Sequence, residues 1–195
     1  MTSPQTIRAF IAIELPQNVK QELGQVSKTL AAQLLSRSVR WVQPANMHLT
    51  LRFLGDTAVS RLPRLAQALD DLVTKHSSFQ LQLNRVGCFP NPKRPRVIWI
   101  GVNGAEAILL AIKRELDERL VPLGWATEDK PFHAHLTIGR VGNGRLPATM
   151  NWTVPVSPVS FSVNGVHLIE SQLTPKGPVY TVRHTAVLPQ KPENT

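Results

Sequence analysis

The sequence has a single cysteine, Cys88, among 195 residues, and this excludes an internal disulfide framework. No apolar run approaches the ~20 residues that a membrane-spanning helix needs. The apolar patch at residues 9–13 is too short for the core of a signal peptide, and Glu14 and Pro16 follow it directly. We therefore expect a soluble cytoplasmic protein that does not engage a membrane.

Acidic residues are also scarce. Thirteen Asp and Glu stand against 22 Lys and Arg, which gives a formal net charge of +9. This excess favours polyanionic partners, chiefly nucleic acid, although a basic solvated surface with no cognate partner would look the same. The hydrophobic fraction of 42% and charged fraction of 18% indicate a globular chain that can bury a core. Charge alone does not identify the function.

Apolar residues recur at helical spacing in three segments, which predicts helices at residues 18–36, 62–74 and 106–120. Segments rich in β-forming residues predict strands at residues 7–15, 39–42, 79–83, 96–102, 160–166, 167–170 and 179–188. The stretch "CFPNPKRPR", residues 88–96, has three prolines and predicts a loop near the boundary between two halves. We expect one bilobal domain over residues 1–189 and a flexible tail at residues 190–195.

A short motif occurs twice, as "MHLTLRFLG" at residues 47–55 and "FHAHLTIGR" at residues 132–140. A helix and a turn precede each copy, so the order of elements suggests two similar α+β lobes with mostly antiparallel sheets. Successive side chains of a strand point to opposite faces. In the first copy His48, Thr50 and Arg52 should therefore share one face, with Leu49, Leu51 and Phe53 on the other. The second copy places His135 and Thr137 together in the same way.

Two histidines on facing strands suit acid–base chemistry at one phosphorus. One imidazole would be neutral and take a proton from the nucleophile, while the other would be protonated and release the leaving oxygen. Each such group supplies ~100-fold to 10,000-fold in rate, and the pair predicts a bell-shaped pH–rate profile. Threonine hydroxyls and nearby arginines would stabilise the phosphate charge, so no metal or other cofactor is needed.

Two other interpretations of the motifs remain open at this point. A single His-x-Thr on a strand is commonly a half-buried polar pair, and repetition with matching aliphatic residues is what favours function. A metal site is the rival chemistry, since His133 and His135 would lie on one face of a strand. It lacks a third ligand at a recognisable spacing, because the chain has no cysteine cluster and no His-Glu-x-x-His pattern.

The two motifs, His48-Leu49-Thr50-Leu51 and His135-Leu136-Thr137-Ile138, resemble the signature of the 2H phosphoesterase superfamily. Within it the chain is similar to the bacterial and archaeal RNA 2′,3′-cyclic phosphodiesterases, also called 2′-5′ RNA ligases. The blocks that carry the resemblance follow in the expected order at residues 8–16, 39–55, 94–102, 132–140 and 168–180.

This resemblance implies a bilobal α+β fold with pseudo-twofold symmetry and a central cleft. It implies metal-independent hydrolysis of a 2′,3′-cyclic phosphate to a 2′-phosphomonoester. His48 would then be the general acid for the 3′ oxygen, His135 the general base for water, and Thr50 and Thr137 the ligands of the phosphate oxygens. The expected partners are RNA with a cyclic phosphate end or small cyclic nucleotides, with no obligate protein partner and a monomeric state.

Several neighbouring residues are secondary candidates. Arg52 and Arg140 could bind phosphate, although simple alternation puts Arg140 opposite His135 unless Gly139 allows a bend. Phe53 would be core by alternation, with base stacking as the alternative. Three further aromatic residues near the expected site could stack on a base, namely Phe10, Trp125 and Phe132. The remaining histidines are expected to be peripheral, structural or on the surface: His76, His133, His167 and His184.

Two alternative functions accompany hydrolysis. The same site could run the reverse chemistry, joining a cyclic phosphate end to a 5′-hydroxyl through a 2′-5′ bond, although water at its normal concentration favours hydrolysis. A non-catalytic RNA-binding module would instead use the basic loop Lys93-Arg94-Pro95-Arg96. The presence of both histidines argues against that module, because binding alone needs no matched proton donor and acceptor.

Overall fold

The computed structural model describes residues 5–34, 38–142, 146–147, 149–175 and 177–190. The strands are β1 (Thr6–Glu14), β2 (Val39–Trp41), β3 (His48–Ala58), β4 (Phe79–Phe89), β5 (Val97–Gly104), β6 (His135–Val141), β7 (Ser160–Val163), β8 (Gly165–Thr174) and β9 (Gly177–Val187). The helices are α1 (Gln17–Ala31), α2 (Leu62–Val73) and α3 (Glu106–Leu120), with 3₁₀ turns η1 (Pro44–Asn46), η2 (Val59–Arg61) and η3 (Val121–Leu123). Apart from Gln190, the expected tail lies outside the described residues.

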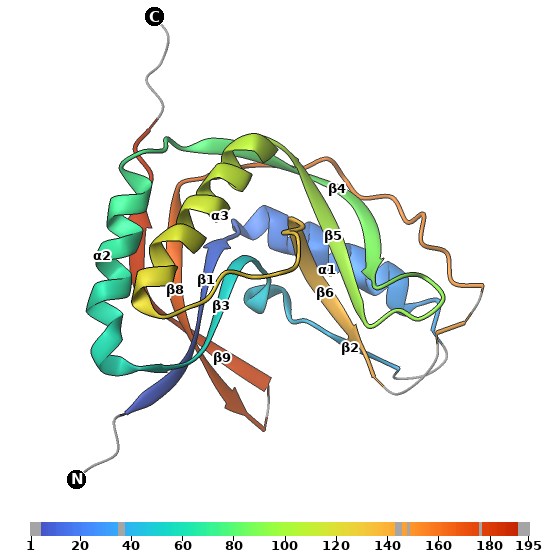
Figure 1. The fold of residues 1–195 in the computed structure, drawn as a ribbon. Helices are drawn as coiled ribbons and strands as arrows, with labels where there is room; N and C mark the ends of the chain where they lie inside the picture. Colours follow the sequence, from blue (N-terminus) through green and yellow to red (C-terminus); the bar gives the residue numbers. More distant parts are fainter. Residues whose placement is uncertain (1–4, 35–37, 143–145, 148, 176, 191–195) are drawn as a thin grey trace, which may run out of the picture.

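The strands form two sheets, and each sheet contains one copy of the motif (Figure 1). The four-stranded sheet has the order β3-β1-β8-β9 and the five-stranded sheet the order β2-β6-β5-β4-β7. Every pairing between the described strands is antiparallel. The predicted α+β class with two mostly antiparallel sheets is therefore confirmed.

The chain alternates between the two sheets along its length. β2 comes from the first third of the chain but joins the five-stranded sheet, and β8 and β9 return to the four-stranded sheet. The proline-rich segment 88–96 contains the end of β4 and the connection to β5, which is the neighbour of β4 in the five-stranded sheet. Each sheet is thus built from both halves of the sequence.

The helices bury the apolar stripes that the sequence predicts. In α1 the residues with almost no exposed surface are Val19, Leu23, Val26 and Leu30, which recur at three- and four-residue spacing and face the core. This helix contacts β6, whereas α2 contacts β8, β9 and α3 (Figure 1). No helix within the described residues is long and apolar enough to cross a membrane.

The first helix ends earlier than its periodicity predicts. We expect it to continue to residue 36, but α1 ends at Ala31. Gln33 and Leu34 instead donate their backbone N–H groups to the carbonyls three residues earlier, at 3.2 and 3.0 Å. Such bonds tighten the last turn of a helix into a 3₁₀ geometry, and Leu34 still packs on the core from there.

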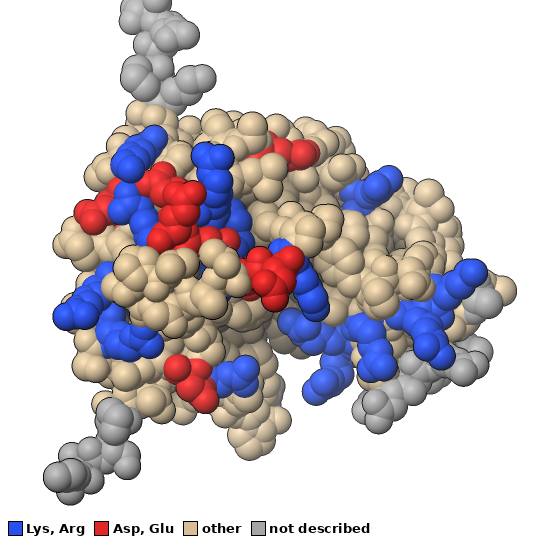
Figure 2. Space-filling view, in the orientation of Figure 1, with Lys and Arg blue, Asp and Glu red and all other residues tan. Residues whose placement is uncertain are grey.

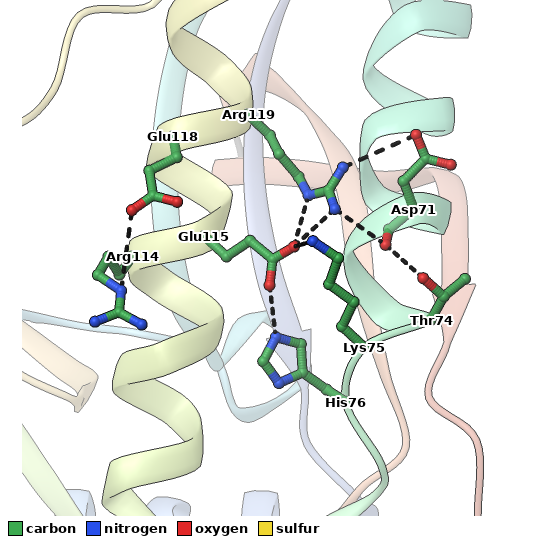
Figure 3. A network of polar contacts seen from close by, with 8 residues as sticks. All are labelled: Asp71, Thr74, Lys75, His76, Arg114, Glu115, Glu118 and Arg119. Atoms are coloured by element: carbon green, nitrogen blue, oxygen red, sulfur yellow. Dashed lines mark hydrogen bonds and ion pairs between the residues drawn. The ribbon is translucent and has the colours of Figure 1, made fainter.

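A polar network joins α3 to α2 and to the residues that follow α2 (Figure 3). The Glu115 carboxylate accepts from Arg119 at 2.7 Å and lies 3.0 Å from His76 Nε2 and 3.2 Å from Lys75 Nζ. Burial alone would raise the pKa of Glu115, but the hydrogen bonds from these three residues outweigh it and lower that pKa to about 2. His76 therefore has a structural role, as expected.

Candidate functional site

The first motif lies at the start of β3 and follows the predicted alternation. His48 and Thr50 are half-buried, while Leu49 and Leu51 are buried in the main core. Thr50 pairs with Ala12 of the neighbouring strand β1. The strand thus anchors itself through its leucines and turns an imidazole and a hydroxyl to the other face.

The second motif is built in the same way at the start of β6. His135 and Thr137 are half-buried, and Leu136 and Ile138 have no exposed surface. β3 and β6 belong to different sheets yet contact each other near the centre of the molecule (Figure 1). The fold therefore brings together two strands whose motifs lie far apart in the sequence.

Each of the two imidazoles makes a hydrogen bond from Nδ1 to a backbone carbonyl two residues earlier in the chain. His48 Nδ1 lies 2.9 Å from the carbonyl oxygen of Asn46, and His135 Nδ1 lies 2.7 Å from that of His133. A carbonyl can only accept, so Nδ1 carries a proton in both rings. Each ring is left with Nε2 to release or take up a proton.

Aromatic side chains surround His48. The Phe10 ring stacks on the imidazole with 4.6 Å between centroids, and the Tyr180 ring meets its edge at 5.3 Å. Burial is the main reason why the pKa of His48 falls from 6.5 to about 4. The charges of Lys20 and Arg140 lower this pKa further, against the opposing effect of the hydrogen bond to Asn46.

His135 has a similar environment in the other sheet. The Phe89 ring meets it edge-on at 5.1 Å, and Trp99 lies 6.3 Å away. Burial again lowers the pKa of this histidine, and the nearby charges of His133 and Arg140 act in the same direction. The hydrogen bond to His133 opposes this shift, and the net lowering of the pKa favours the neutral form of His135.

The prediction that Arg52 shares the face of His48 and Thr50 is wrong. Thr50 pairs with Ala12 and Arg52 with Ile11, so Leu51 is an extra residue that forms a β-bulge. Beyond the bulge the faces exchange. Phe53, predicted to be core, is 61% exposed on the side of the Phe10 ring, which is 6.2 Å away.

Arg52 is instead enclosed by acidic and carbonyl groups inside the protein. Its side chain is 7% exposed, and its Nη1 lies 3.3 Å from both Asp117 Oδ1 and Glu128 Oε2. The guanidinium also donates to the carbonyl of Ala126. These contacts join β3 to α3 and to the segment that leads to His135, so Arg52 holds the two motif strands in place relative to each other.

A second bulge has the opposite consequence for Arg140. Trp99 pairs with Thr137 and Ile98 with Gly139, so Ile138 is the extra residue. Arg140 therefore turns to the face of His135, contrary to simple alternation. A Cβ at Gly139 would lie 2.9 Å from the Val39 side chain and 3.0 Å from the Trp41 ring, so a larger residue here would have to displace these side chains.

Arg140 is close enough to act on both histidines and on Tyr180, because its charge lowers the pKa of all three. It pairs across the strands with Arg40, and Arg96 lies beside them before β5. These three arginines are exposed and form no ion pair within the part of the chain that the structure describes. Figure 2 shows a row of Lys and Arg side chains in the region of β2 and β6.

The remaining aromatic and histidine candidates make different contacts in the structure. Trp125 donates its indole N–H to the carbonyl of Leu54, near the end of the first motif, at 2.9 Å and stacks on Arg61. Phe132 lines a cavity beside His135. His184 bonds to Asp70 at 2.7 Å and His167 to Thr185 at 3.1 Å. Among the described residues, no group of three or more His, Cys, Asp or Glu side chains could hold a metal ion.

Sequence reasoning missed two residues that shape the site. Tyr180 comes from β9, far along the chain from the histidine that it contacts, and its only signal is its place at the end of the block 168–180. Asn46 accepts from His48 through its carbonyl and donates its side-chain amide to the Pro178 carbonyl at 3.0 Å. Asn46 thus ties the His48 ring to the β8–β9 hairpin that carries Tyr180.

Comparison with known proteins supports this picture. The model of the LigT like phosphoesterase family matches the chain twice, over residues 13–99 and 100–180. An RNA 2′,3′-cyclic phosphodiesterase of Methanothermobacter thermautotrophicus is 33% identical over 90% of this chain and 95% of the relative. One of Thermus thermophilus is 36% identical over 90% of this chain and 87% of the relative.

Solved structures show the same fold. A protein of Thermus thermophilus superposes with a TM-score of 0.79 at 29% identity, covering 95% of this chain and all of the other. LigT of E. coli, solved in complex with 3′-AMP, gives a TM-score of 0.76 at 25% identity with the same coverage.

Proposed function

The chain belongs to the family of LigT-like phosphoesterases, and we propose that it hydrolyses RNA 2′,3′-cyclic phosphate ends to 2′-phosphomonoesters. One observation carries this proposal. Two His-x-Thr strands from different sheets contact each other, and both imidazoles use Nδ1 to bond a backbone carbonyl. Two Nε2 atoms are then available for proton transfer. The names of the relatives support the substrate.

The two histidines divide the proton transfers. His135 takes the proton of water through Nε2 as the water oxygen bonds to phosphorus, and His48, protonated at Nε2 once the substrate is bound, gives that proton to the departing 3′ oxygen. One P–O bond forms and one breaks, which leaves a 2′-phosphate and a 3′-hydroxyl. The choice of His48 as acid and His135 as base rests on the family resemblance, because the hydrogen bonds of the two rings are alike.

The phosphate charge has suitable partners on the same faces. Thr50 and Thr137 follow the histidines by two residues and offer hydroxyl donors to the nonbridging oxygens. Arg140 supports this role because its charge acts on both histidines and no carboxylate engages it within the described part of the chain. The like charges of Arg40 and Arg140 on paired strands favour an anion beside them. Arg40 and Arg96 would bind the further phosphates of a longer RNA, whereas a small cyclic nucleotide would offer only its reacting phosphate.

The experiment is hydrolysis of a short RNA with a 2′,3′-cyclic phosphate end in excess chelator. We expect the wild type to form the 2′-phosphate and His48→Ala and His135→Ala to be slower by ~100-fold to 10,000-fold. His184→Gln, which alters a histidine bonded to Asp70, is the matched control and should keep full activity. An inactive wild type that still binds RNA would favour a non-catalytic module, and loss of activity on chelation would favour a metal mechanism.

A further inference from the structure

A cavity of about 360 Å³ lies where the start of α2 meets the turn that follows α3. Its volume falls in the range of small-molecule sites in proteins, which is roughly 300 to 1,000 Å³. The described residues that line it come from η2 and α2 on one side and from η3 and the turn after it on the other: Ser60, Arg61, Arg64, Pro122, Leu123 and Trp125. None of these described residues is acidic, and none lies in a His-x-Thr motif.

The guanidinium of Arg61 is held in place over the ring of Trp125. Its central carbon lies 3.7 Å from the ring centroid, and the indole is itself fixed through its hydrogen bond to Leu54. Gly124 leaves room beside this pair, because a Cβ there would lie 3.1 Å from Arg61 Nη2 and its φ of +89° favours glycine. Stacking covers one face of a guanidinium and leaves the N–H groups in its plane available to an anion.

The two arginines of this cavity lack the partner that an arginine of the neighbouring helix has. Arg61 and Arg64 are three residues apart, so their side chains are neighbours on the helical surface and their like charges repel. Neither forms an ion pair with a carboxylate in the part of the chain that the structure describes. On α3, by contrast, Arg114 lies 3.9 Å from Glu118. An anion between Arg61 and Arg64 would remove the repulsion.

A phosphate monoester suits these groups. It carries a charge of about −1.5 to −2 at pH 7, which matches two guanidinium groups, and arginine binds phosphate oxygens through paired N–H donors. The Ser60 hydroxyl is a further donor. Pro122 and Leu123 form an apolar part of the wall that can contact an organic group attached to the phosphate. We propose that this cavity binds a small phosphate monoester at a site separate from the two histidines.

The location of the cavity favours a small molecule over the RNA chain. In Figure 2 the Lys and Arg side chains near the start of α2 lie well apart from the row in the region of β2 and β6, which would bind RNA phosphates. Leu54, which bonds Trp125, comes six residues after His48, or about 20 Å along an extended strand. A phosphate bound here is therefore not the reacting phosphate.

The first test follows the indole N–H signals of the four tryptophans by NMR while inorganic phosphate or AMP is added. Trp125→Phe identifies the Trp125 signal by its absence. We expect both ligands to shift this signal, and adenosine, which lacks a phosphate, to leave it in place. A Trp125 signal that stays fixed with phosphate and AMP overturns the inference. A shift with adenosine equal to that with AMP also overturns it, because the phosphate would then not be recognised.

The second test removes one charge from the cavity wall. Arg64→Gln, at an exposed position, should weaken the binding of phosphate seen at Trp125 by about tenfold or more. The matched control is Arg114→Gln, which removes the same charge from an exposed position outside the cavity and should keep the wild-type affinity. Equal affinity in Arg64→Gln and the wild type overturns the inference.

The ring signals of His48, followed in the same samples, report phosphate at the motifs and separate the two sites. They should respond equally in the wild type and in both variants, whereas the response of Trp125 should weaken only in Arg64→Gln. A Trp125 response in a protein whose His48 signals do not respond would support the cavity and count against phosphate binding at the motifs.

A short RNA with an ordinary 3′-hydroxyl end distinguishes the two sources of phosphate. We expect this RNA to leave the Trp125 signal in place at concentrations at which AMP shifts it. A Trp125 shift caused by the RNA and not by AMP would assign the cavity to the RNA chain and overturn the proposal of a small phosphate monoester.

Discussion

Binding of phosphate in the cleft should return His48 to its protonated form at neutral pH. In the free protein, burial and the charges of Lys20 and Arg140 hold the pKa of His48 at about 4, so the ring is neutral and has no Nε2 proton to give. A phosphate brings a negative charge to the ring nitrogen. The substrate itself would thus create the acid that its leaving oxygen needs.

The size of this effect follows from the charge separation. Opposite unit charges about 4 Å apart, at an effective dielectric constant of about 20, attract by about 4 kcal/mol. This corresponds to a factor of about 1,000 in the protonation constant. It is enough to move the pKa of His48 from about 4 into the neutral range.

The assay is an NMR titration of the histidine rings with and without saturating inorganic phosphate, with His184 as an internal reference outside the motifs. We expect bound phosphate to raise the pKa of His48 from about 4 into the neutral range and to raise the pKa of His135 as well. The reasoning is refuted if free His48 titrates at its ordinary value, or if bound phosphate leaves its pKa unchanged. In activity profiles, the need for protonated His48 should appear as loss of rate when pH rises through the pKa of the complex.

Three further outcomes are expected. Arg52→Ala should lower the free energy of unfolding by about 1 to 3 kcal/mol in urea titrations, because it removes a buried guanidinium that bonds Asp117, Glu128 and the Ala126 carbonyl, although Lys113 still pairs with both carboxylates; a neutral result would contradict the network. Glu115→Gln should lower the free energy of unfolding by about 1 to 2 kcal/mol at pH 7. Because the pKa of Glu115 is lowered from 4.5 to about 2 in the folded state, this loss of stability should disappear as pH falls through that window. A loss of stability that does not depend on pH would argue against a role of the Glu115 charge. Arg140→Gln should weaken inorganic phosphate binding about tenfold by calorimetry, and unchanged affinity would remove Arg140 from the site.

The parts of the site that depend on local pattern could be predicted from the sequence. The alternation around His48 and His135 identified the buried aliphatic face and the half-buried polar face, and the helix at residues 106–120 has the predicted bounds. These features depend on side-chain periodicity within one element. The family resemblance also named the fold, which the structure and the solved relatives confirm.

The predictions that failed are those that depend on how a strand pairs with its neighbour. A β-bulge arises from how two strands pair, and nothing local in "LTLRF" shows that Leu51 is the extra residue. The same event at Ile138 brought Arg140 to the site, with Gly139 as the only hint in the sequence. Tyr180 could not be placed because its contact with His48 exists only after the C-terminal hairpin has joined the four-stranded sheet.

The most direct test of the two-histidine mechanism uses a cyclic phosphate in which sulfur replaces the 3′ oxygen. A thiolate departs without a proton, so this substrate does not need the general acid. We predict that His48→Ala, slow by ~100-fold to 10,000-fold on the oxygen substrate, approaches the wild-type rate on the sulfur substrate, while His135→Ala stays slow on both. Rescue of His135→Ala instead would reverse the two roles, and rescue of neither variant would contradict the division of proton transfers between the two histidines.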